Sequence, residues 1–398
     1  MTLTGQKIRD LIRELGSDDA SVRRCAAEEL SGADERALLP LIKALRDSNP
    51  GVQDAAMRSL IDIGGEATAY MVLPLLRDNA VMRNTAVIIL QEIGAAAVPM
   101  IGPLLNDKDE DIRKFAIDMI CEIGACDRPE DLMAILRGDP NPNVRVSAAK
   151  ALGALRYPQA VPVLIDALRD TEWVCFSALE ALSQIKDNSS VEAVAELLYS
   201  PSEAVRSEAI HAAASIGTED ALKALEEHLE AEDTPESEKL LTIRGLLSAG
   251  VVPESKEAAD LMLCLLMEDD WDDKVLAFMG LSAIKDERAL FHIIDAAGSI
   301  SPSMPDSEHR FHEIKSALMG FGCNEALLAL VNDGRLKFKG LSFLIDLLGE
   351  MRCAEAVPLI SPLLDSKVLD IKKACARALR QIEGIAAGLS GEDGESVC

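Results

Sequence analysis

The side chains that most often perform catalysis or bind metals are sparse in this chain of 398 residues, which has only five His and nine Cys. Only His312-Glu313 places a His directly before an acidic residue, and one such pair cannot complete a metal site. The sequence contains no C-x-x-C motif, Gly-rich phosphate loop, G-x-S-x-G or H-E-x-x-H motif. We therefore expect no catalytic residues, no metal and no cofactor.

The cysteines are scattered along the chain and do not form the even, closely spaced set of a disulfide framework. Cys323 and Cys353 lie 30 residues apart, about one repeat, in successive predicted loops, so stacking of the repeats can bring them close together. Without a second pair of ligands, they do not indicate zinc. The odd cysteine count and the charged start MTLTGQKIRDLIREL predict reduced thiols and a cytoplasmic location.

The charge balance argues against two classes of partner. The chain has 40 basic and 67 acidic residues, a formal net charge of −27. Nucleic-acid binding relies on Lys and Arg to neutralise phosphates, so we expect no nucleic-acid partner. The longest uncharged run, residues 93–106, is shorter than the roughly 18 residues that a membrane helix needs, so we also expect no membrane contact.

A short pattern recurs along the chain and reveals its organisation. The segment VQDAAMRSLIDIG from Val52 returns as MRNTAVIILQEIG from Met82 and as IRKFAIDMICEIG from Ile112. Weaker copies begin at Val144, Val174 and Val205, so the repeat is about 31 residues long. Apolar residues at i, i+3, i+4 and i+7 predict an amphipathic helix in each copy.

A second pattern precedes each copy, as in AVPMIGPLLND from Ala97 and AVPVLIDALRD from Ala160. It predicts another amphipathic helix, and Pro suits the first turn of a helix. Pro74, Pro103 and Pro362 fall well inside this first helix. One unit is therefore helix, turn, helix, turn, and a pair this small must stack on its neighbours to bury its apolar face.

Four features of the repeat resemble HEAT repeats, specifically the short HEAT-like repeats also found in phycobilin lyases. They are the A-V-P start of the first helix, the Asp before the turn, the Val/Ile-Arg start of the second helix and the Ile-Gly at its end. The resemblance implies an all-α fold, an α-solenoid of about twelve HEAT-like repeats in an armadillo-type superhelix. Three stretches depart from the rhythm: a long turn at 228–237, a Pro- and Ser-rich insertion at 298–308 and a polar tail. We expect regular repeats over 1–217, divergent acidic repeats over 218–345, a C-terminal repeat over 346–384 and a tail over 385–398.

Two sets of side chains recur at fixed repeat positions. We interpret the Arg at the opening of the second helices and the Asp before the turns as a structural ladder of opposite charges between stacked repeats. A row of Arg for anionic ligands is the alternative. The ladder residues are Arg83, Arg113, Arg145 and Arg206 with Asp78, Asp107 and Asp170.

The resemblance implies that the second helix of each unit lines a concave groove. Positions two and six residues after each repeat start then face a partner, and they are chemically mixed. Trp173, Phe176 and the nearby Tyr157 are notable in a chain with 3 % aromatics, because aromatic anchors are favoured at binding hot spots, although core packing is the competing interpretation. The candidate groove residues are Arg58, Lys114, Lys150, Tyr157, Trp173, Phe176, Glu180 and His211.

These features predict a non-enzymatic scaffold or adaptor that binds a partner protein along the groove. The segment 219–273 carries 17 acidic and 4 basic residues, which favours a basic partner but also suits a solvated face. The resemblance allows a second function, a bilin lyase or chromophore-handling subunit with Tyr157, Trp173 and Phe176 beside Arg145. A regulatory subunit of a larger enzyme complex is a third. The oligomeric state stays open.

Overall fold

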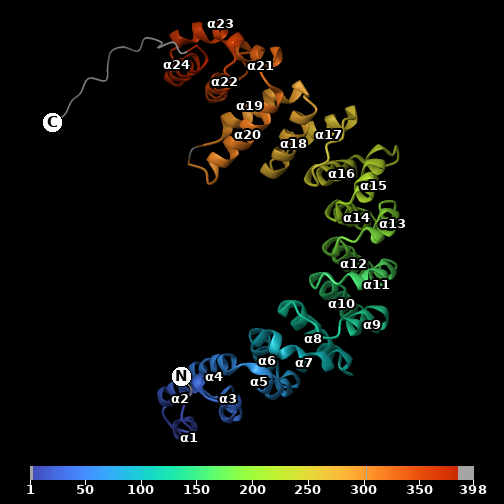
Figure 1. Ribbon diagram of the computed structural model, residues 1–398, viewed down its shortest axis with the longest axis vertical. Coiled ribbons are helices and arrows are strands. Elements are labelled where there is room, and N and C mark those ends of the chain that lie inside the picture. Colours follow the sequence, from blue (N-terminus) through green and yellow to red (C-terminus); the bar gives the residue numbers. More distant parts are fainter. Residues whose placement is uncertain (1–2, 302, 384–398) are drawn as a thin grey trace, which may run out of the picture. The chain divides into compact units, whose positions relative to one another are not determined.

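A computed structural model describes residues 3–301 and 303–383, and these residues contain helices and turns but no strand. The chain divides into two compact units, Met1–Ala221 and Leu222–Cys398, with the division inside helix α15 (Glu219–Glu230). Figure 1 shows paired helices throughout both units. The predicted boundary at 217/218 lies just before α15, and the predicted tail over 385–398 lies outside the described residues.

In unit 1 the second helices of the repeats form one continuous row, which we call the second row. Each packs on the next member of the row, and the strongest packing is between α10 and α12. The row consists of α2 (Ala20–Glu29), α4 (Pro50–Ile63), α6 (Ala80–Ile93), α8 (Glu110–Ile123), α10 (Pro142–Ala154), α12 (Glu172–Ile185) and α14 (Glu203–Ile216).

The first helices of unit 1 form the other row, which we call the first row. Apart from α9, those that follow α2 are short, because 3-10 turns replace part of each helix. The row consists of α1 (Gly5–Glu14), α3 (Leu38–Ala44), α5 (Gly65–Val72), α7 (Val98–Ile101), α9 (Pro129–Gly138), α11 (Val161–Ala167) and α13 (Val191–Leu197).

Prolines end two of the first-row helices, α5 and α7, early. α5 gives way to a 3-10 helix at Leu73–Arg77, and α7 does so at Gly102–Asn106, in both cases at the proline in the second position of the new turn. Proline has no N–H to donate and its ring clashes with the carbonyl four residues earlier, so an α-helix cannot continue through it unchanged. The same change occurs at Ser361–Asp365 in unit 2.

Unit 2 is built from the same kind of helix pairs with less regular spacing. Small residues again allow close packing: a Cβ on Gly349 would lie 2.5 Å from Cα of Ala378, so α22 and α24 touch through their backbones. After α15 the helices are α16 (Glu236–Ser248), α17 (Lys256–Met267), α18 (Trp271–Ala283), α19 (Leu290–Ser299), α20 (Ser307–Phe321), α21 (Glu325–Ala329), α22 (Phe338–Glu350), α23 (Val357–Ile360) and α24 (Leu369–Glu383).

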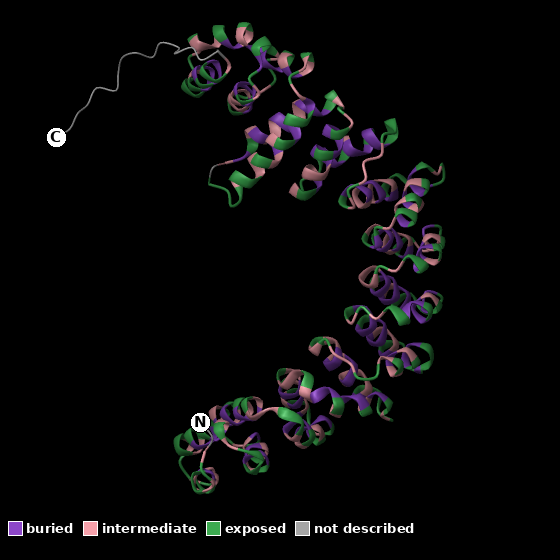
Figure 2. Ribbon diagram, viewed as in Figure 1, coloured by how far each residue is buried: buried purple, intermediate pink, exposed green. Residues whose placement is uncertain are grey.

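The core of each unit is aliphatic and lies between its helix rows. Figure 2 shows buried residues on the facing sides of the helices and exposed residues on the outer sides and in the turns. Leu60, Leu90, Ile120 and Leu152 are fully buried at corresponding positions of successive repeats. Burial of each such side chain stabilises the fold by about 1.5–3 kcal/mol, so the stacked repeats hold one another together.

One stretch, Ala80–Asn106, is long and apolar enough to cross a membrane by length and composition, whereas the sequence analysis expected none. The difference arises because this stretch extends beyond the uncharged run 93–106 and includes two charged residues, Arg83 and Glu92. In the structure it is not one helix: α6 ends at Gly94, where φ is 69°, and α7 follows after a 3-10 turn. A core helix passes the same composition test, so this stretch is weak evidence for a membrane span.

Candidate functional site

The second row of unit 1 presents a continuous set of side chains that are not buried. The positions two and six residues after each repeat start are all half-buried or exposed, while their helical neighbours form the core. We call this surface the second-row face. It consists of Asp54, Arg58, Asn84, Ile88, Lys114, Asp118, Val146, Lys150, Phe176, Glu180, Ser207 and His211.

Two hollows interrupt the second-row face. The larger, of 440 Å³, lies between α8 and α10 and is lined by Lys114, Asp118 and Lys150 among others. Within it the Lys114 ammonium lies 2.6 Å from the Asp118 carboxylate, which also accepts a hydrogen bond from the Ser147 hydroxyl at 3.1 Å. The smaller hollow, of 210 Å³, lies between α4 and α6 and includes Asp54. These hollows have mixed polarity, as expected for a surface that contacts another protein.

Trp173 at the start of α12 is the most exposed large apolar side chain of the described residues, with 73 % of its surface accessible. Its ring meets the half-buried ring of Phe176, a residue of the second-row face, edge-on, with centroids 5.8 Å apart. The indole therefore borders this face, packs one edge against it and leaves most of its surface open to solvent. Arg58, on α4, and Glu180 and His211, further along the face, are exposed.

Tyr157 takes a different position from the one we expected. Its hydroxyl donates a hydrogen bond to the Glu130 carboxylate of α9, a first-row helix, at 3.2 Å. Burial and the neighbouring Glu130 raise the pKa of the Tyr157 hydroxyl. The structure therefore engages Tyr157 with the first row.

Ion pairs link successive repeats, and Arg145–Asp170 joins two of the predicted ladder residues. Arg113 donates from Nε and Nη2 to both oxygens of Asp139, at 2.7 and 2.9 Å. Arg145 forms the same two-pronged contact with Asp170, at 2.7 Å for both bonds. Each arginine also donates to a backbone carbonyl of the turn before its own helix. Each of these guanidinium groups thus links two repeats and also satisfies a backbone carbonyl in the turn before its own helix.

The other predicted ladder residues form different contacts. Asp78 and Asp107 pair with Arg46 and Arg77, which end the preceding first-row segments. Arg83 lies 5.5 Å from the ring centroid of Phe115. The Arg83 guanidinium donates to the backbone carbonyls of residues 76 and 78, and that of Arg206 donates to the carbonyl of residue 200.

These contacts shift the acidity of the carboxylates. Burial acts to raise the pKa of Asp139, but hydrogen bonds from Arg113 and from the Asn141 backbone outweigh it and lower the pKa overall. The hydrogen bond from Arg145 lowers the pKa of Asp170, and the one from Arg77 lowers that of Asp107. Arg113 and Arg145 are occupied by carboxylates, which favours a structural role for these ladder arginines over anion binding.

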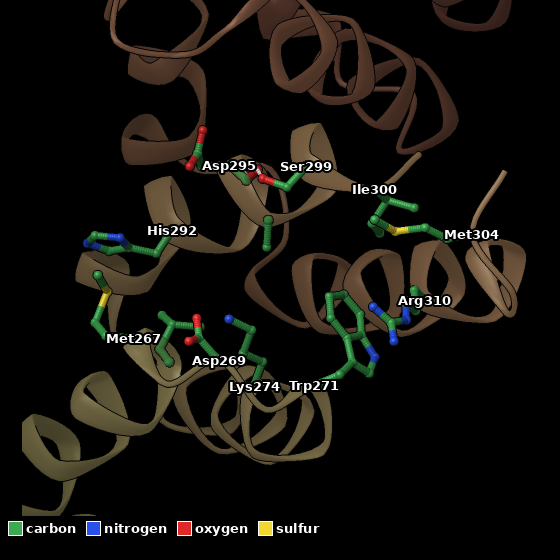
Figure 3. Close-up of a pocket in the computed structure, with 12 residues that line it drawn as sticks. Met267, Asp269, Trp271, Lys274, His292, Asp295, Ser299, Ile300, Met304 and Arg310 are labelled. Carbon is green, nitrogen blue, oxygen red and sulfur yellow. Dashed lines mark hydrogen bonds between the residues drawn. The ribbon is translucent and has the colours of Figure 1, made fainter. Parts of the chain in front are cut away.

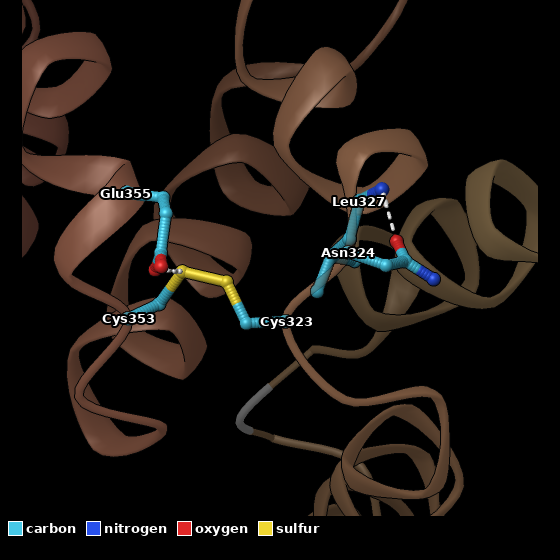
Figure 4. Close-up of a disulfide and its surroundings, with 5 residues drawn as sticks. All are labelled: Cys323, Asn324, Leu327, Cys353 and Glu355. Atoms are coloured by element: carbon cyan, nitrogen blue, oxygen red, sulfur yellow. Dashed lines mark hydrogen bonds between the residues drawn. A yellow bond between two sulfur atoms is a disulfide. The ribbon is translucent and has the colours of Figure 1, made fainter.

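Unit 2 corrects the expectation that the thiols are reduced. Cys323 and Cys353 form a disulfide, with Cα atoms 6.1 Å apart, and Glu355 lies 3.4 Å from the Cys353 sulfur (Figure 4). The bond joins the loop after α20 to the loop after α22. The carboxylate and the two sulfurs are close enough for a metal site, but a disulfide has no thiolate to offer. Among the described residues, this is the one group close enough to hold a metal ion.

The sequence analysis missed a pocket in unit 2, which Trp271, Lys274 and Arg310 line together with residues of the predicted insertion. The available signals were the insertion over 298–308 and a tryptophan at the start of a helix. Neither indicated that α18 and α20 place these side chains around one cavity.

Comparisons with known proteins agree with this architecture. A family model of HEAT repeats matches residues 8–91, 129–201 and 174–243, which together make up half of the chain. An uncharacterized phycocyanin operon protein Z from Pseudanabaena tenuis is 28 % identical over 166 residues, covering 39 % of this chain and 81 % of that protein.

Solved structures support the fold. Kap95p bound to RanGDP is 11 % identical with a TM-score of 0.50, and the match covers 94 % of this chain and 62 % of that one. Kap95 in complex with Nup1 is 11 % identical with a TM-score of 0.52, and the match covers 94 % and 61 %. At this identity the likeness shows the fold alone. Together with the repeat pattern and the stacked helix pairs, the family match establishes that the chain belongs to the HEAT-repeat family.

Proposed function

We propose that the chain is a non-enzymatic scaffold that binds a partner protein on the second-row face of unit 1. The observation that carries this proposal is the exposure of Trp173 on a face whose twelve repeat positions are all accessible. Tryptophan is among the residues most enriched at protein-binding hot spots. The Kap95 structures are solenoids of this fold with bound proteins, which supports a protein as the ligand.

The mixed charges of the second-row face suit recognition of a partner by many separate contacts. Lys114 and Asp118 already neutralise each other. Lys150 lines the same larger hollow together with Glu110 and Asp111, so this hollow carries charges of both signs. Trp173 supplies apolar area, and Lys150, Glu180 and His211 remain exposed around it. A partner with an apolar anchor surrounded by polar groups fits this arrangement.

Site-specific photo-crosslinking tests the location of the partner. A photoreactive amino acid at Glu180 or Lys150 on the second-row face is expected to capture one and the same protein from the native cell lysate. The matched control carries the photoreactive group at Tyr70, which is 66 % exposed on the first-row helix α5 of the same unit. Capture of the same protein from Tyr70 and not from Glu180 or Lys150 would contradict the proposal.

The acidic segment over 219–273 supports a basic partner or a basic region of that partner. Some of its carboxylates are already paired, including Asp273 with Arg244 and Glu257 with Lys239. The remaining acidic excess favours association that weakens as salt screens it. An affinity that does not change between low and physiological salt would contradict a basic partner while leaving the second-row face in place.

A chromophore-handling subunit is the second candidate, and the similarity to a phycocyanin operon protein favours it. The patch that we expected to serve it is not preformed: Arg145 is bound to Asp170, and Tyr157 to Glu130. Titration with the linear tetrapyrrole biliverdin tests this candidate. A saturable shift of its visible absorption supports it, and an unchanged spectrum contradicts it. A regulatory role in a larger enzyme complex is compatible with the scaffold proposal and would emerge from the identity of the crosslinked partner.

A further inference from the structure

Unit 2 contains a pocket of 320 Å³ that the proposed scaffold function does not use. Helices α18, α19 and α20 surround it, and the predicted insertion contributes Ile300 and Met304 to its wall (Figure 3). Its volume is at the lower end of the range for small-molecule sites, about 300–1,000 Å³. The pocket is therefore large enough for a small organic ligand.

Trp271 and Arg310 form a rigid pair at one side of this pocket. The indole Nε1–H of Trp271 donates a hydrogen bond to the Glu313 carboxylate at 2.8 Å, and its ring meets Phe278 edge-on. The Arg310 guanidinium carbon lies 4.5 Å from the Trp271 ring centroid. Figure 3 shows the two side chains next to each other, on α18 and α20. Stacking on the indole leaves the N–H groups at the edge of the guanidinium free to donate.

The two cations that line the pocket contrast with three paired arginines of unit 2. Arg244, Arg288 and Arg377 each form an ion pair with a carboxylate. Arg310 and Lys274, both half-buried, form no ion pair with any residue that the structure describes. A half-buried guanidinium without a carboxylate is a favourable partner for an incoming anion, because a charge-assisted contact gains strength where water is partly excluded.

The rest of the pocket is apolar on one side and acidic on another. Met267 and Met304 are 65 % and 43 % exposed, and with Ile300 they offer a flexible apolar surface. Asp269 and Asp295 also line the pocket, and they disfavour a ligand with several negative charges. The site therefore suits a single negative charge attached to an apolar body.

We infer that this pocket binds a small organic monoanion, with a carboxylate or similar head on Arg310 and an apolar body against Met267, Ile300 and Met304. Lys274 assists by its charge. Trp271 positions the guanidinium of Arg310 and shields one side of the ligand. This binding site lies wholly in unit 2, so it is independent of the partner surface proposed for unit 1.

The test compares two fluorescent probes that share an apolar body and differ in charge. Anilinonaphthalene sulfonate carries one negative charge, whereas N-phenylnaphthylamine is neutral. The chain has two tryptophans, so in the full-length Trp173→Phe variant all tryptophan emission comes from Trp271 in the pocket. We expect one molecule of the sulfonate per chain to quench Trp271 by energy transfer, with at least about tenfold higher affinity than the neutral probe. Laurate is expected to displace the sulfonate, and dodecanol is not.

Variants of the full-length protein assign the effect to the pocket. Arg310→Gln is expected to weaken sulfonate binding about tenfold and to leave the neutral probe unchanged, and Arg310→Lys is expected to fall between. The matched control is Arg380→Gln, an exposed cation on α24 away from the pocket. Circular dichroism checks that each variant keeps its helices.

Equal affinity of the two probes, or sulfonate binding that survives in Arg310→Gln, would overturn the inference. If Arg310→Gln loses its helices, Arg310→Lys and the laurate–dodecanol comparison decide the question. Displacement by both compounds would show an apolar site without a role for charge. None of these results affects the proposal for unit 1, which is tested at Trp173 and Glu180.

Discussion

The two units of the chain use the same helix pairs but hold them together differently. In unit 1 the repeats are nearly alike, and arginine–aspartate pairs such as Arg113–Asp139 and Arg145–Asp170 connect neighbouring repeats. In unit 2 the spacing is irregular, a disulfide joins two repeats, and the insertion over 298–308 borders a pocket. Regular stacking creates a long accessible face suited to a protein, whereas an irregular repeat can create a pocket suited to a small molecule.

The largest effect is expected from breaking the most buried ion pair of unit 1. Arg113→Ala leaves the carboxylate of Asp139, whose side chain is only 5 % exposed, without its charged partner. The free energy of unfolding of unit 1 should fall by about 3–5 kcal/mol, as is typical when one member of a buried pair is removed. Hydrogen exchange of unit 1 peptides in increasing urea measures this change.

The control for this prediction is Arg46→Ala, which breaks the ion pair between Arg46 and Asp78, a more exposed pair than Arg113–Asp139. It should destabilise unit 1 far less, since exposed pairs contribute little. Equal losses in the two variants would contradict the view that burial determines the strength of the ladder.

Reduction of the disulfide should destabilise unit 2 and leave unit 1 unchanged. The bond between Cys323 and Cys353 closes a loop of 30 residues, for which the chain-entropy model gives about 3–4 kcal/mol. Cys323→Ser is the matching variant, because Cys323 is exposed whereas Cys353 is buried. Trp271 fluorescence in urea, with and without dithiothreitol, measures the change. An identical urea midpoint in both conditions would show that the bond does not contribute to stability.

Close packing through glycine should be equally important in both units. A Cβ on Gly153 would lie 2.6 Å from Cα of Ala181, and one on Gly349 would lie 2.5 Å from Cα of Ala378. Gly153→Ala and Gly349→Ala should therefore each cost about 1–3 kcal/mol, despite the better helix propensity of alanine. Thermal unfolding followed by circular dichroism checks this. Gly138→Ala, where the added carbon meets nothing within 4 Å, should be neutral or stabilising.

Acid should weaken unit 1 more than unit 2. The pKa values of Asp107, Asp139 and Asp170 are lowered in the folded state, by hydrogen bonds from arginines of other repeats. A lowered pKa in the folded state gives stability that is present above the unfolded pKa of about 3.9 and is lost as pH falls through the folded value. Unit 1 peptides should therefore lose protection from hydrogen exchange below about pH 4. Earlier loss in unit 2 would contradict this ordering.

The helices could be predicted from the sequence because the apolar residues after Val52, Met82 and Ile112 repeat with the period of a helix. The family resemblance and the change of helix type at Pro74 and Pro103 came from the same local signals. Such features depend on neighbouring residues, which the sequence displays directly.

The pairings between repeats could not be predicted, because they depend on how far one repeat is offset on the next. Arg113 reaches Asp139, 26 residues further along, which is not among the predicted ladder residues. The pocket of unit 2 has the same origin, since Trp271 and Arg310 come from different helices. The proximity of Cys323 and Cys353 was foreseen from their loops, but their oxidation was not.

The central claim is that Trp173 anchors a protein partner on the second-row face, and the most direct test is the affinity of the crosslinked partner for Trp173→Ala. This side chain is 73 % exposed, so its removal should leave helicity and stability within about 0.5 kcal/mol of the natural protein. The affinity for the partner should fall at least about 30-fold, equivalent to about 2 kcal/mol. Tyr70→Ala should bind like the natural protein. Unchanged binding by a folded Trp173→Ala variant would contradict the account.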